Sequence, residues 1–165
     1  MLMSSSVLTH FDRDRLIKLT IDASSFGVGA IISHVYDDKS ERPIAFASRL
    51  LNSTELRYSK IEKEACAIIF GVKNFLQYLY GRRFLLYSDH KPLLSIFGSK
   101  KGTPQFAANR LQRWAHILSA FDYDIHYVNS NNNSADYFSR HPVDSENSDY
   151  NYSKQNYLFS DLQID

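Results

Sequence analysis

The first fifty residues contain three segments with the two-residue alternation of β-strands, joined by connections too short to hold a helix. The segments cover residues 16–23, 27–36 and 43–48. Parallel neighbours need a crossover of about a dozen residues or more, whereas antiparallel neighbours need only a turn. We therefore predict an antiparallel three-stranded meander, whose apolar face a further layer must cover.

The period changes to that of a helix after residue 58, where Ser59 and Glu62 have the spacing of a capping box. Apolar residues then recur three or four positions apart, which predicts one helix that Tyr80-Gly81 closes. The remaining predicted elements are a strand at 84–88, a helix at 92–97, a helix at 109–119, a strand at 123–128 and a short helix that contains Asp136 and is capped by Ser134. The predicted fold class is α/β, with a five-stranded mixed sheet of the meander plus two parallel strands, flanked by helices.

The composition is that of an ordinary globular protein. The chain has 165 residues, of which 44% are hydrophobic and 22% charged, so one domain is expected. Its one cysteine, Cys66, excludes an internal disulfide and a cysteine-based zinc site, and we expect it to be an inert core thiol. No apolar run approaches the roughly 20 residues that span a membrane, and residues 1–10 lack a secretion signal, so we expect an intracellular protein.

The net charge of +1 hides a division along the chain. Residues 1–140 carry 18 Lys and Arg against 13 Asp and Glu, whereas residues 141–165 carry one Lys against five acids. The basic body is weak evidence for nucleic-acid binding. From residue 142 onward Ser, Asn, Asp and Tyr dominate without a period, so we interpret residues 142–165 as an acidic flexible tail or linker.

Four acidic residues lie where a purely structural role is costly. Asp22 and Asp89 fall at the carboxyl ends of predicted strands, where open α/β sheets place their sites. Glu64 lies on the helix face that points at the sheet, and Asp136 lies in the last short helix. Each alone can be an N-cap, a turn residue or the partner of an arginine. Together they would form an oxygen cage suited to Mg²⁺ or Mn²⁺, and two such ions about 4 Å apart catalyse phosphodiester cleavage.

Seven motifs include or surround these acids. They are Leu-Thr-Ile-Asp-Ala-Ser-Ser-Phe-Gly-Val-Gly-Ala (19–30), Arg-Pro-Ile-Ala-Phe-Ala-Ser-Arg (42–49), Tyr-Ser-Lys-Ile-Glu-Lys-Glu-Ala (58–65), Tyr-Leu-Tyr-Gly-Arg-Arg-Phe (78–84), Tyr-Ser-Asp-His-Lys-Pro-Leu (87–93), Arg-Leu-Gln-Arg-Trp (110–114) and Asn-Ser-Ala-Asp-Tyr-Phe-Ser-Arg (133–140). In these motifs and their order, over roughly residues 8 to 143, the chain resembles the ribonuclease H domain of gypsy-type LTR retrotransposon reverse transcriptases.

The resemblance implies a ribonuclease H-like fold and hydrolysis of the RNA strand of RNA–DNA hybrids, leaving 5′-phosphate and 3′-hydroxyl ends. It assigns Asp22, Glu64, Asp89 and Asp136 to the family's metal-binding set for two ions, Mg²⁺ or Mn²⁺. In that set Asp22 would bridge both ions, Glu64 and Asp89 would hold one, and Asp136 would hold the other.

The resemblance also implies a place in a longer polyprotein, between a polymerase region and an integrase region. Residues 1–15 would be the connection from the polymerase region, residues 16–141 the ribonuclease H-like domain, and residues 142–165 the linker toward integrase. The expected partners are the RNA–DNA hybrid and these two regions, with no membrane. The expected location is cytoplasmic, within a virus-like particle, or nuclear.

Two features depart from the family's pattern. Tyr137 and Phe138 follow the last acid, where relatives often have a small residue, so that a ring could crowd the site or stack on a nucleotide. The loop at 129–133 has no histidine, whereas cellular and retroviral relatives carry one there that is thought to help product release. Gypsy-type domains often lack this histidine.

Gly27 and Gly29 could let the backbone approach the RNA strand, where amides and carbonyls read the 2′-hydroxyl; the alternative is a strand start with a bulge. Trp114 has helical spacing with core residues, which favours burial over stacking on a base. His90 adjoins a proposed ligand and lacks a second soft ligand, so a structural or ligand-orienting role is expected.

Four basic residues are candidates for contacts with the DNA phosphates. Lys100 and Lys101 lie in a predicted loop, and Arg110 and Arg113 lie in the helix that follows. The alternative is a solvated loop and helix face.

Two other classes of function remain open. A catalytically retired module could bind hybrids or polyprotein partners without cutting, but such a domain is expected to have lost at least one of the four acids. An integrase or transposase core has a related fold and a three-acid order in which the glutamate comes last. Here the helical Glu64 comes second, which argues against that class.

Overall fold

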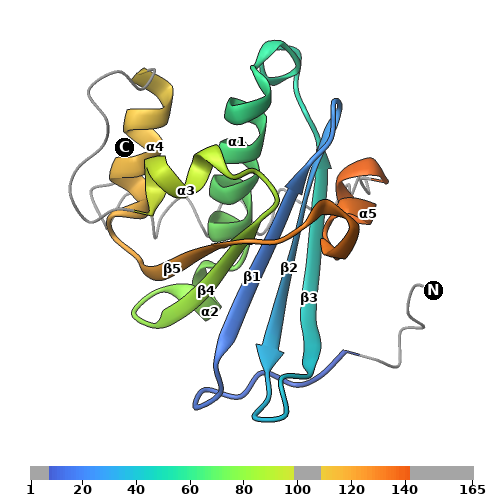
Figure 1. Cartoon of the computed structure of the whole chain (residues 1–165), viewed down its shortest axis with the longest axis vertical. Helices are drawn as coiled ribbons and strands as arrows, with labels where there is room; N and C mark the ends of the chain where they lie inside the picture. The colour runs from blue at the N-terminus through green and yellow to red at the C-terminus, as the bar shows by residue number, and fades with distance from the viewer. Residues whose placement is uncertain (1–7, 99–108, 142–165) are drawn as a thin grey trace.

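The computed structural model describes residues 8–98 and 109–141, without the side chains of Tyr137 and Phe138. Its centre is one five-stranded sheet in the order β3-β2-β1-β4-β5 (Figure 1). The strands are β1 (Ile17–Ala23), β2 (Gly27–Val35), β3 (Glu41–Leu50), β4 (Arg83–Ser88) and β5 (Asp122–Tyr127). β1, β2 and β3 pair antiparallel, whereas β4 pairs parallel with both β1 and β5. The mixed sheet predicted from the sequence is confirmed.

Helices cover both faces of the sheet (Figure 1). They are α1 (Lys60–Asn74), α2 (Leu76–Leu79), α3 (Pro92–Phe97), α4 (Asn109–Leu118) and α5 (Asp136–Arg140), with single 3₁₀ turns at Glu55–Arg57 and Ser130–Asn132. α1 packs on the face formed by Leu19, Ile21 and Ala30, with α4 beside it. α5 lies on the opposite face, where it contacts β1, β2 and β3. The capping box predicted at the start of α1 is present.

The one long helix predicted from residue 60 to Tyr80 is wrong, because the helix breaks at Phe75. Phe75 has φ −108° and ψ 23°, and separates α1 from the single turn of α2. The apolar spacing continues across the break since Leu76 and Leu79 are buried as well. Periodicity reports which residues face the core, so it does not register a break that leaves that face unchanged. Gly81, at φ 73°, then turns the chain toward β4.

Residues 9–15 pack against the sheet rather than leaving it. The backbone N–H of Asp12 donates to Nε2 of His34 at 2.8 Å, and His34 is completely buried. Phe11 stacks on His34 and contacts Tyr78 edge-on. The backbone N–H of Thr9 donates to the carbonyl oxygen of Pro43 at 2.9 Å. The domain boundary predicted at residue 16 stays a prediction, and these contacts favour an earlier one.

The core confirms the structural interpretation of two residues. Trp114 is 8% exposed and meets Tyr58 edge-on. Cys66 is buried, and burial raises the pKa of its thiol to about 11. Across residues 8–98 and 109–141, no helix combines the length and the apolar character that crossing a membrane requires.

Gly71 lets α1 pack closely on the sheet. An added Cβ would lie 3.2 Å from Ala30 Cβ and Ile21 Cγ2 and 3.3 Å from Leu19 Cδ1. We expect Gly71→Ala to lower the free energy of unfolding by up to about 2 kcal/mol, because overpacking costs about 1–3 kcal/mol and better helix propensity returns about 1 kcal/mol. Urea denaturation measures this change, and a gain in stability would contradict the packing described here.

Candidate active site

Three carboxylates meet where β1 and β4 end. Asp22 is the next-to-last residue of β1, and Asp89 directly follows β4. Because these neighbouring strands are parallel, both acids leave the sheet at the same edge. Glu64 reaches them from the first turns of α1. One ligand oxygen from each of the three lies within 4.8 Å of the others. The convergence predicted from the sequence is therefore present for these three acids.

Glu64 is the acid whose surroundings most favour a bound cation. It is 2% exposed, and its Oε2 has no hydrogen-bond partner within the described part of the chain. Burial, with the charges of Asp22 and Asp89 adding, raises the pKa of Glu64 to about 9. A buried acceptor without a partner is costly unless it receives a proton or a cation. The donor set, which is made of carboxylate oxygens, fits a hard divalent cation such as Mg²⁺ or Mn²⁺.

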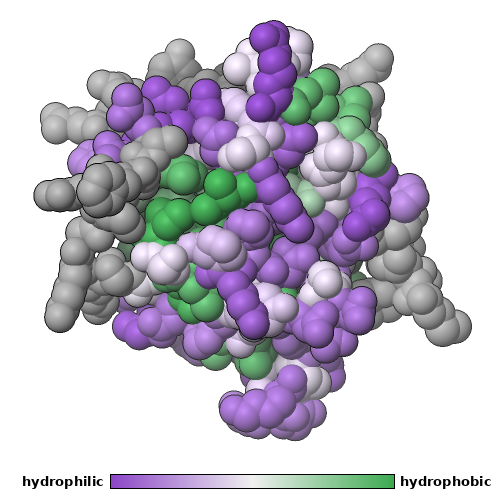
Figure 2. Space-filling model, turned by 45° about the horizontal axis from the view of Figure 1, so that its top comes forward, coloured by the Kyte–Doolittle hydropathy of each residue, from purple (hydrophilic) through white to green (hydrophobic). Residues whose placement is uncertain are grey.

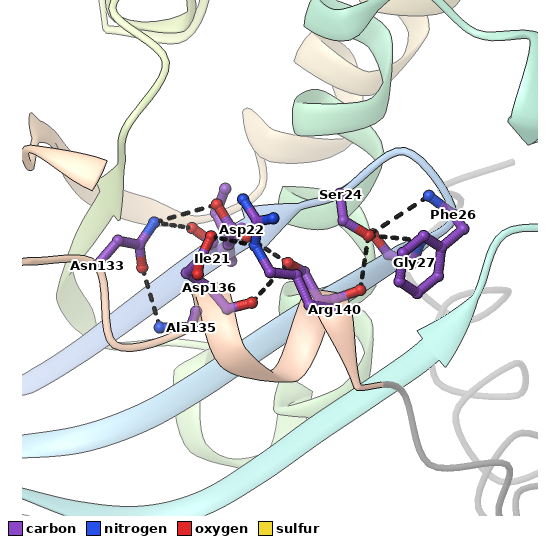
Figure 3. A network of polar contacts seen from close by, with 10 residues as sticks. Ile21, Asp22, Ser24, Phe26, Gly27, Asn133, Ala135, Asp136 and Arg140 are labelled. Carbon is purple, nitrogen blue, oxygen red and sulfur yellow. Dashed lines mark hydrogen bonds and ion pairs between the residues drawn. The ribbon is translucent and has the colours of Figure 1, made fainter. Parts of the chain in front are cut away.

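Asp22 lies at the centre of a polar network (Figure 3). Asp22 is 3% exposed, and its burial raises the pKa of the carboxyl group to about 6. The hydrogen bond from the Ser139 hydroxyl lowers this pKa, whereas the negative charges of Asp89 and Asp136 raise it further. The ionised form is thus destabilised by burial and by neighbouring negative charge. A cation beside Asp22 would reverse that balance.

Asp136 is the first residue of α5, and its Oδ1 accepts a hydrogen bond from Nε of Arg140 at 2.9 Å (Figure 3). The charge of Asp136 raises the pKa of Asp22. Asp136 is not one of the three acids whose ligand oxygens lie within 4.8 Å of one another. Just before α5, Asn133 forms a turn in which its Oδ1 accepts the N–H of Ala135 at 3.0 Å, and the cap predicted at Ser134 stays a prediction. Asparagine competes well for such a role because its short amide folds back on the following backbone.

Sequence reasoning gave no role to two residues that touch Asp22. The Ser139 hydroxyl donates to Asp22 Oδ2, and Asn133 Nδ2 lies 3.5 Å from Asp22 Oδ1. Both residues lie within the motif at 133–140, but nothing in the sequence says which strand that motif meets. His90 is half-buried beside Asp89, and burial, with Lys60 adding, lowers the pKa of its imidazole.

The two candidate glycines for contact with RNA lie in the buried, regular part of β2. Gly29 pairs with Asp22 on β1, and Gly27 pairs with Leu50 on β3. The alternative was a strand start with a bulge: β2 does begin at Gly27, but the irregularity of its pairing with β3 falls between Ile32 and Ser33 and not at the glycines.

The basic candidates differ from one another. Arg110 donates to Oε1 of Glu62, and its guanidinium lies 4.0 Å from the centre of the Tyr58 ring, so its charge is already paired. Arg113 is exposed. Lys100 and Lys101 lie outside the described residues, as does the side chain of Tyr137. Figure 2, which brings the top of Figure 1 forward, shows a mainly hydrophilic surface broken by apolar areas.

Comparison with known proteins agrees with this arrangement. Residues 12–121 match the family described as "RNase H-like domain found in reverse transcriptase", a range that includes Asp22, Glu64 and Asp89. The chain is 38% identical over 141 residues to the retrovirus-related Pol polyprotein from transposon 297 of Drosophila melanogaster, covering 85% of this chain and 12% of that protein. It is 33% identical over 172 residues to the Tf2-3 transposon polyprotein of Schizosaccharomyces pombe, covering 98% of this chain and 13% of that protein.

A solved structure shares the fold at low sequence identity. The crystal structure of LC11-RNase H1 in complex with RNA/DNA hybrid superposes with a TM-score of 0.56 at 15% identity, covering 78% of this chain and 96% of that one. The chain thus spans about an eighth of the curated polyproteins and nearly the whole of a ribonuclease H domain. Fold, family match and transposon relatives agree that this chain belongs to the RNase H-like domains of reverse transcriptases, of the kind found in transposon Pol polyproteins.

Proposed function

We propose that this chain is a metal-dependent endonuclease that hydrolyses the RNA strand of RNA–DNA hybrids during reverse transcription. One observation carries the proposal: three carboxylates from β1, α1 and the end of β4 converge, and one buried oxygen of Glu64 has no partner within the described residues. The family supports the reaction class, and LC11-RNase H1, which shares the fold, was crystallised with an RNA/DNA hybrid.

Asp22, Glu64 and Asp89 would hold one Mg²⁺ or Mn²⁺ ion, and Asp136 together with Asp22 would hold the second. Bound metal ions supply an activated water and stabilise the leaving oxygen. The protein's part is to hold the carboxylates in place as ligands. Asp136 is paired with Arg140, which is largely exposed, so this ion pair can open at little cost.

Recognition of the hybrid would use contacts that do not read sequence. Lys100, Lys101 and Arg113 are proposed to contact DNA phosphates, whereas Arg110 is occupied by Glu62 and is a weaker candidate. Phosphate contacts give affinity without sequence discrimination. Discrimination against DNA would come from the 2′-hydroxyl.

The proposal extends to the setting of the domain. The transposon relatives are polyproteins, so we propose that polymerase and integrase regions accompany this domain and that it acts in the cytoplasm, in virus-like particles, or in the nucleus.

A cleavage assay on end-labelled duplexes tests the proposal. In Mg²⁺ we expect the RNA strand of a hybrid to be cut at many positions, duplex DNA of the same sequence to stay intact, and EDTA to stop the reaction. A protein that binds the hybrid and leaves it intact in both Mg²⁺ and Mn²⁺ would instead be a retired binding module.

Metal binding also predicts a change in stability. The folded arrangement binds the ion and the unfolded chain does not, so Mg²⁺ at about 100 times its Kd adds about 2.7 kcal/mol to the free energy of unfolding. We expect a rise in Tm of about 5–10 °C over EDTA, measured by calorimetry. The same concentration of K⁺, with ionic strength matched, is the control. Equal Tm values in Mg²⁺ and EDTA would contradict the metal site.

A further inference from the structure

The segment that carries Asp136 also holds Asp22 from two sides. Ser139 is completely buried, and its hydroxyl donates to Oδ2 of Asp22. Asn133, 6% exposed, donates from Nδ2 to the Ile21 carbonyl oxygen at 3.0 Å and lies 3.5 Å from Oδ1 of Asp22. Each oxygen of Asp22 thus has its own donor, 111 and 117 residues further along the chain.

Both donors are themselves fixed by hydrogen bonds. The amide oxygen of Asn133 accepts the backbone N–H of Ala135 at 3.0 Å, which sets the orientation of its NH₂ group. The carbonyl oxygen of Ser139 accepts the hydroxyl of Ser24 at 2.7 Å, which ties this turn of α5 to the residues after β1. The side-chain amide of Asn133 and the backbone of Ser139 are therefore held in place beside one carboxylate.

This geometry leaves Asp22 able to bind a cation. A carboxylate oxygen has two lone pairs, so one donor on each oxygen leaves a second acceptor position free on each. An oxygen of Asp22 lies within 4.8 Å of the oxygens of Glu64 and Asp89. Hydrogen bonds from outside a metal site orient its ligands and commonly change metal affinity or activity about 10–100-fold.

We propose that Ser139 and Asn133 are positioning residues, which hold the carboxylate of Asp22 in the orientation that binds the metal ion. The inference rests on the proposed function. It makes α5 a part of the site in two ways, since the helix supplies Asp136, and Ser139 within the helix and Asn133 just before it orient Asp22. The competing explanation is that these contacts only dock α5 on the sheet.

Ser24 provides the matched control for docking. Its hydroxyl bonds to the backbone of Ser139 and to the turn before β2, and no bond joins it to Asp22 in the described network. Ser24→Ala therefore weakens the attachment of α5 and leaves the donor to Asp22 in place. Ser139→Ala removes that donor with little change in volume, and Ser139→Thr keeps a hydroxyl.

The experiment measures Mg²⁺ affinity by titration calorimetry on the full chain, after circular dichroism has shown that each variant is folded. We expect Ser139→Ala and Asn133→Ala each to bind Mg²⁺ about tenfold more weakly, Ser139→Thr to recover most of that loss, and Ser24→Ala to stay within about twofold of wild type. With Mg²⁺ limiting and the hybrid concentration varied, the apparent kcat should fall in Ser139→Ala while KM for the hybrid is unchanged.

The outcomes separate this inference from the proposed function. Wild-type protein that binds Mg²⁺ and cuts hybrid, beside Ser139→Ala and Asn133→Ala with equal Mg²⁺ affinity, overturns the inference alone. An equal loss of affinity in Ser24→Ala overturns it as well, because docking would then explain the effect. Wild-type protein that neither binds Mg²⁺ nor cuts hybrid overturns the proposed function and the inference together.

Discussion

Asp22→Asn is expected to abolish cleavage of the RNA–DNA hybrid and to remove the rise in Tm with Mg²⁺. Asp22 is the buried acid that lies within reach of Glu64 and Asp89 and whose pKa responds to Asp136, so it is the residue common to both proposed ions. We expect a loss of at least about three orders of magnitude in rate, equivalent to about 4 kcal/mol of activation free energy. A quenched-flow or gel assay under single-turnover conditions measures it.

The same variant should remain folded in EDTA. Removing one negative charge from a buried cluster relieves repulsion, so its Tm without metal should equal or exceed that of wild type. Asp124→Asn is the matched control, because Asp124 is an acid on β5 that pairs with Arg83. Cleavage by Asp124→Asn should match wild type. Substantial cleavage by Asp22→Asn would remove Asp22 from the site.

Glu64→Gln should stabilise the metal-free protein and change its pH dependence. The pKa of Glu64 is about 9 when folded, against an ordinary value of 4.5, so the folded state holds a proton that the unfolded state has released. Stability contributed by this proton is fully present below about pH 4.5 and is lost as pH rises toward 9. The free energy of unfolding of wild type in EDTA should therefore fall over this pH range. Asp22 adds to the fall between its ordinary pKa of 3.8 and about pH 6.

Glu64→Gln has no carboxyl group at this position, so its stability should not fall in this way as pH rises. At pH 8 in EDTA we expect its free energy of unfolding to exceed that of wild type by up to about 4–5 kcal/mol, because pH 8 lies about 3.5 units above the ordinary pKa of a glutamate and below the folded pKa of Glu64. Its Tm should no longer respond to Mg²⁺. Urea denaturation from pH 5 to pH 9 measures the first effect, and calorimetry with Mg²⁺ the second.

Glu62→Gln is the control on the same helix, and its effect on stability should be opposite to that of Glu64→Gln. Burial alone would raise the pKa of Glu62, but hydrogen bonds from Ser59 and the Arg110 guanidinium hold it below its ordinary value. The stability that ionised Glu62 contributes is present above the pKa of the unfolded state and is lost as pH falls. Glu62→Gln should therefore destabilise at neutral pH. Identical pH profiles for wild type and Glu64→Gln would show that Glu64 is not the buried, protonated acid described here.

The order of strands and helices was predictable because it depends on local patterns. Alternation within 16–23 and 27–36, short connections and the capping box at Ser59 all act between near neighbours in the chain. The convergence of Asp22 with Asp89 followed from parallel pairing of β1 with β4. Even the convergence of Glu64 was predictable, because helical periodicity shows which face of α1 meets the sheet.

Tertiary packing decided what depends on residues far apart in the chain. The break at Phe75 keeps the apolar face intact, so periodicity could not reveal it. Arg110 could meet either solvent or a partner, and the packing of α4 against α1 gave it Glu62. The sequence by itself therefore determined the fold class and the acids that meet at the sheet edge. The surroundings of each acid, above all Ser139 and Asn133 around Asp22, were decided by the docking of α5, because hydrogen bonds over more than a hundred residues have no periodic signature.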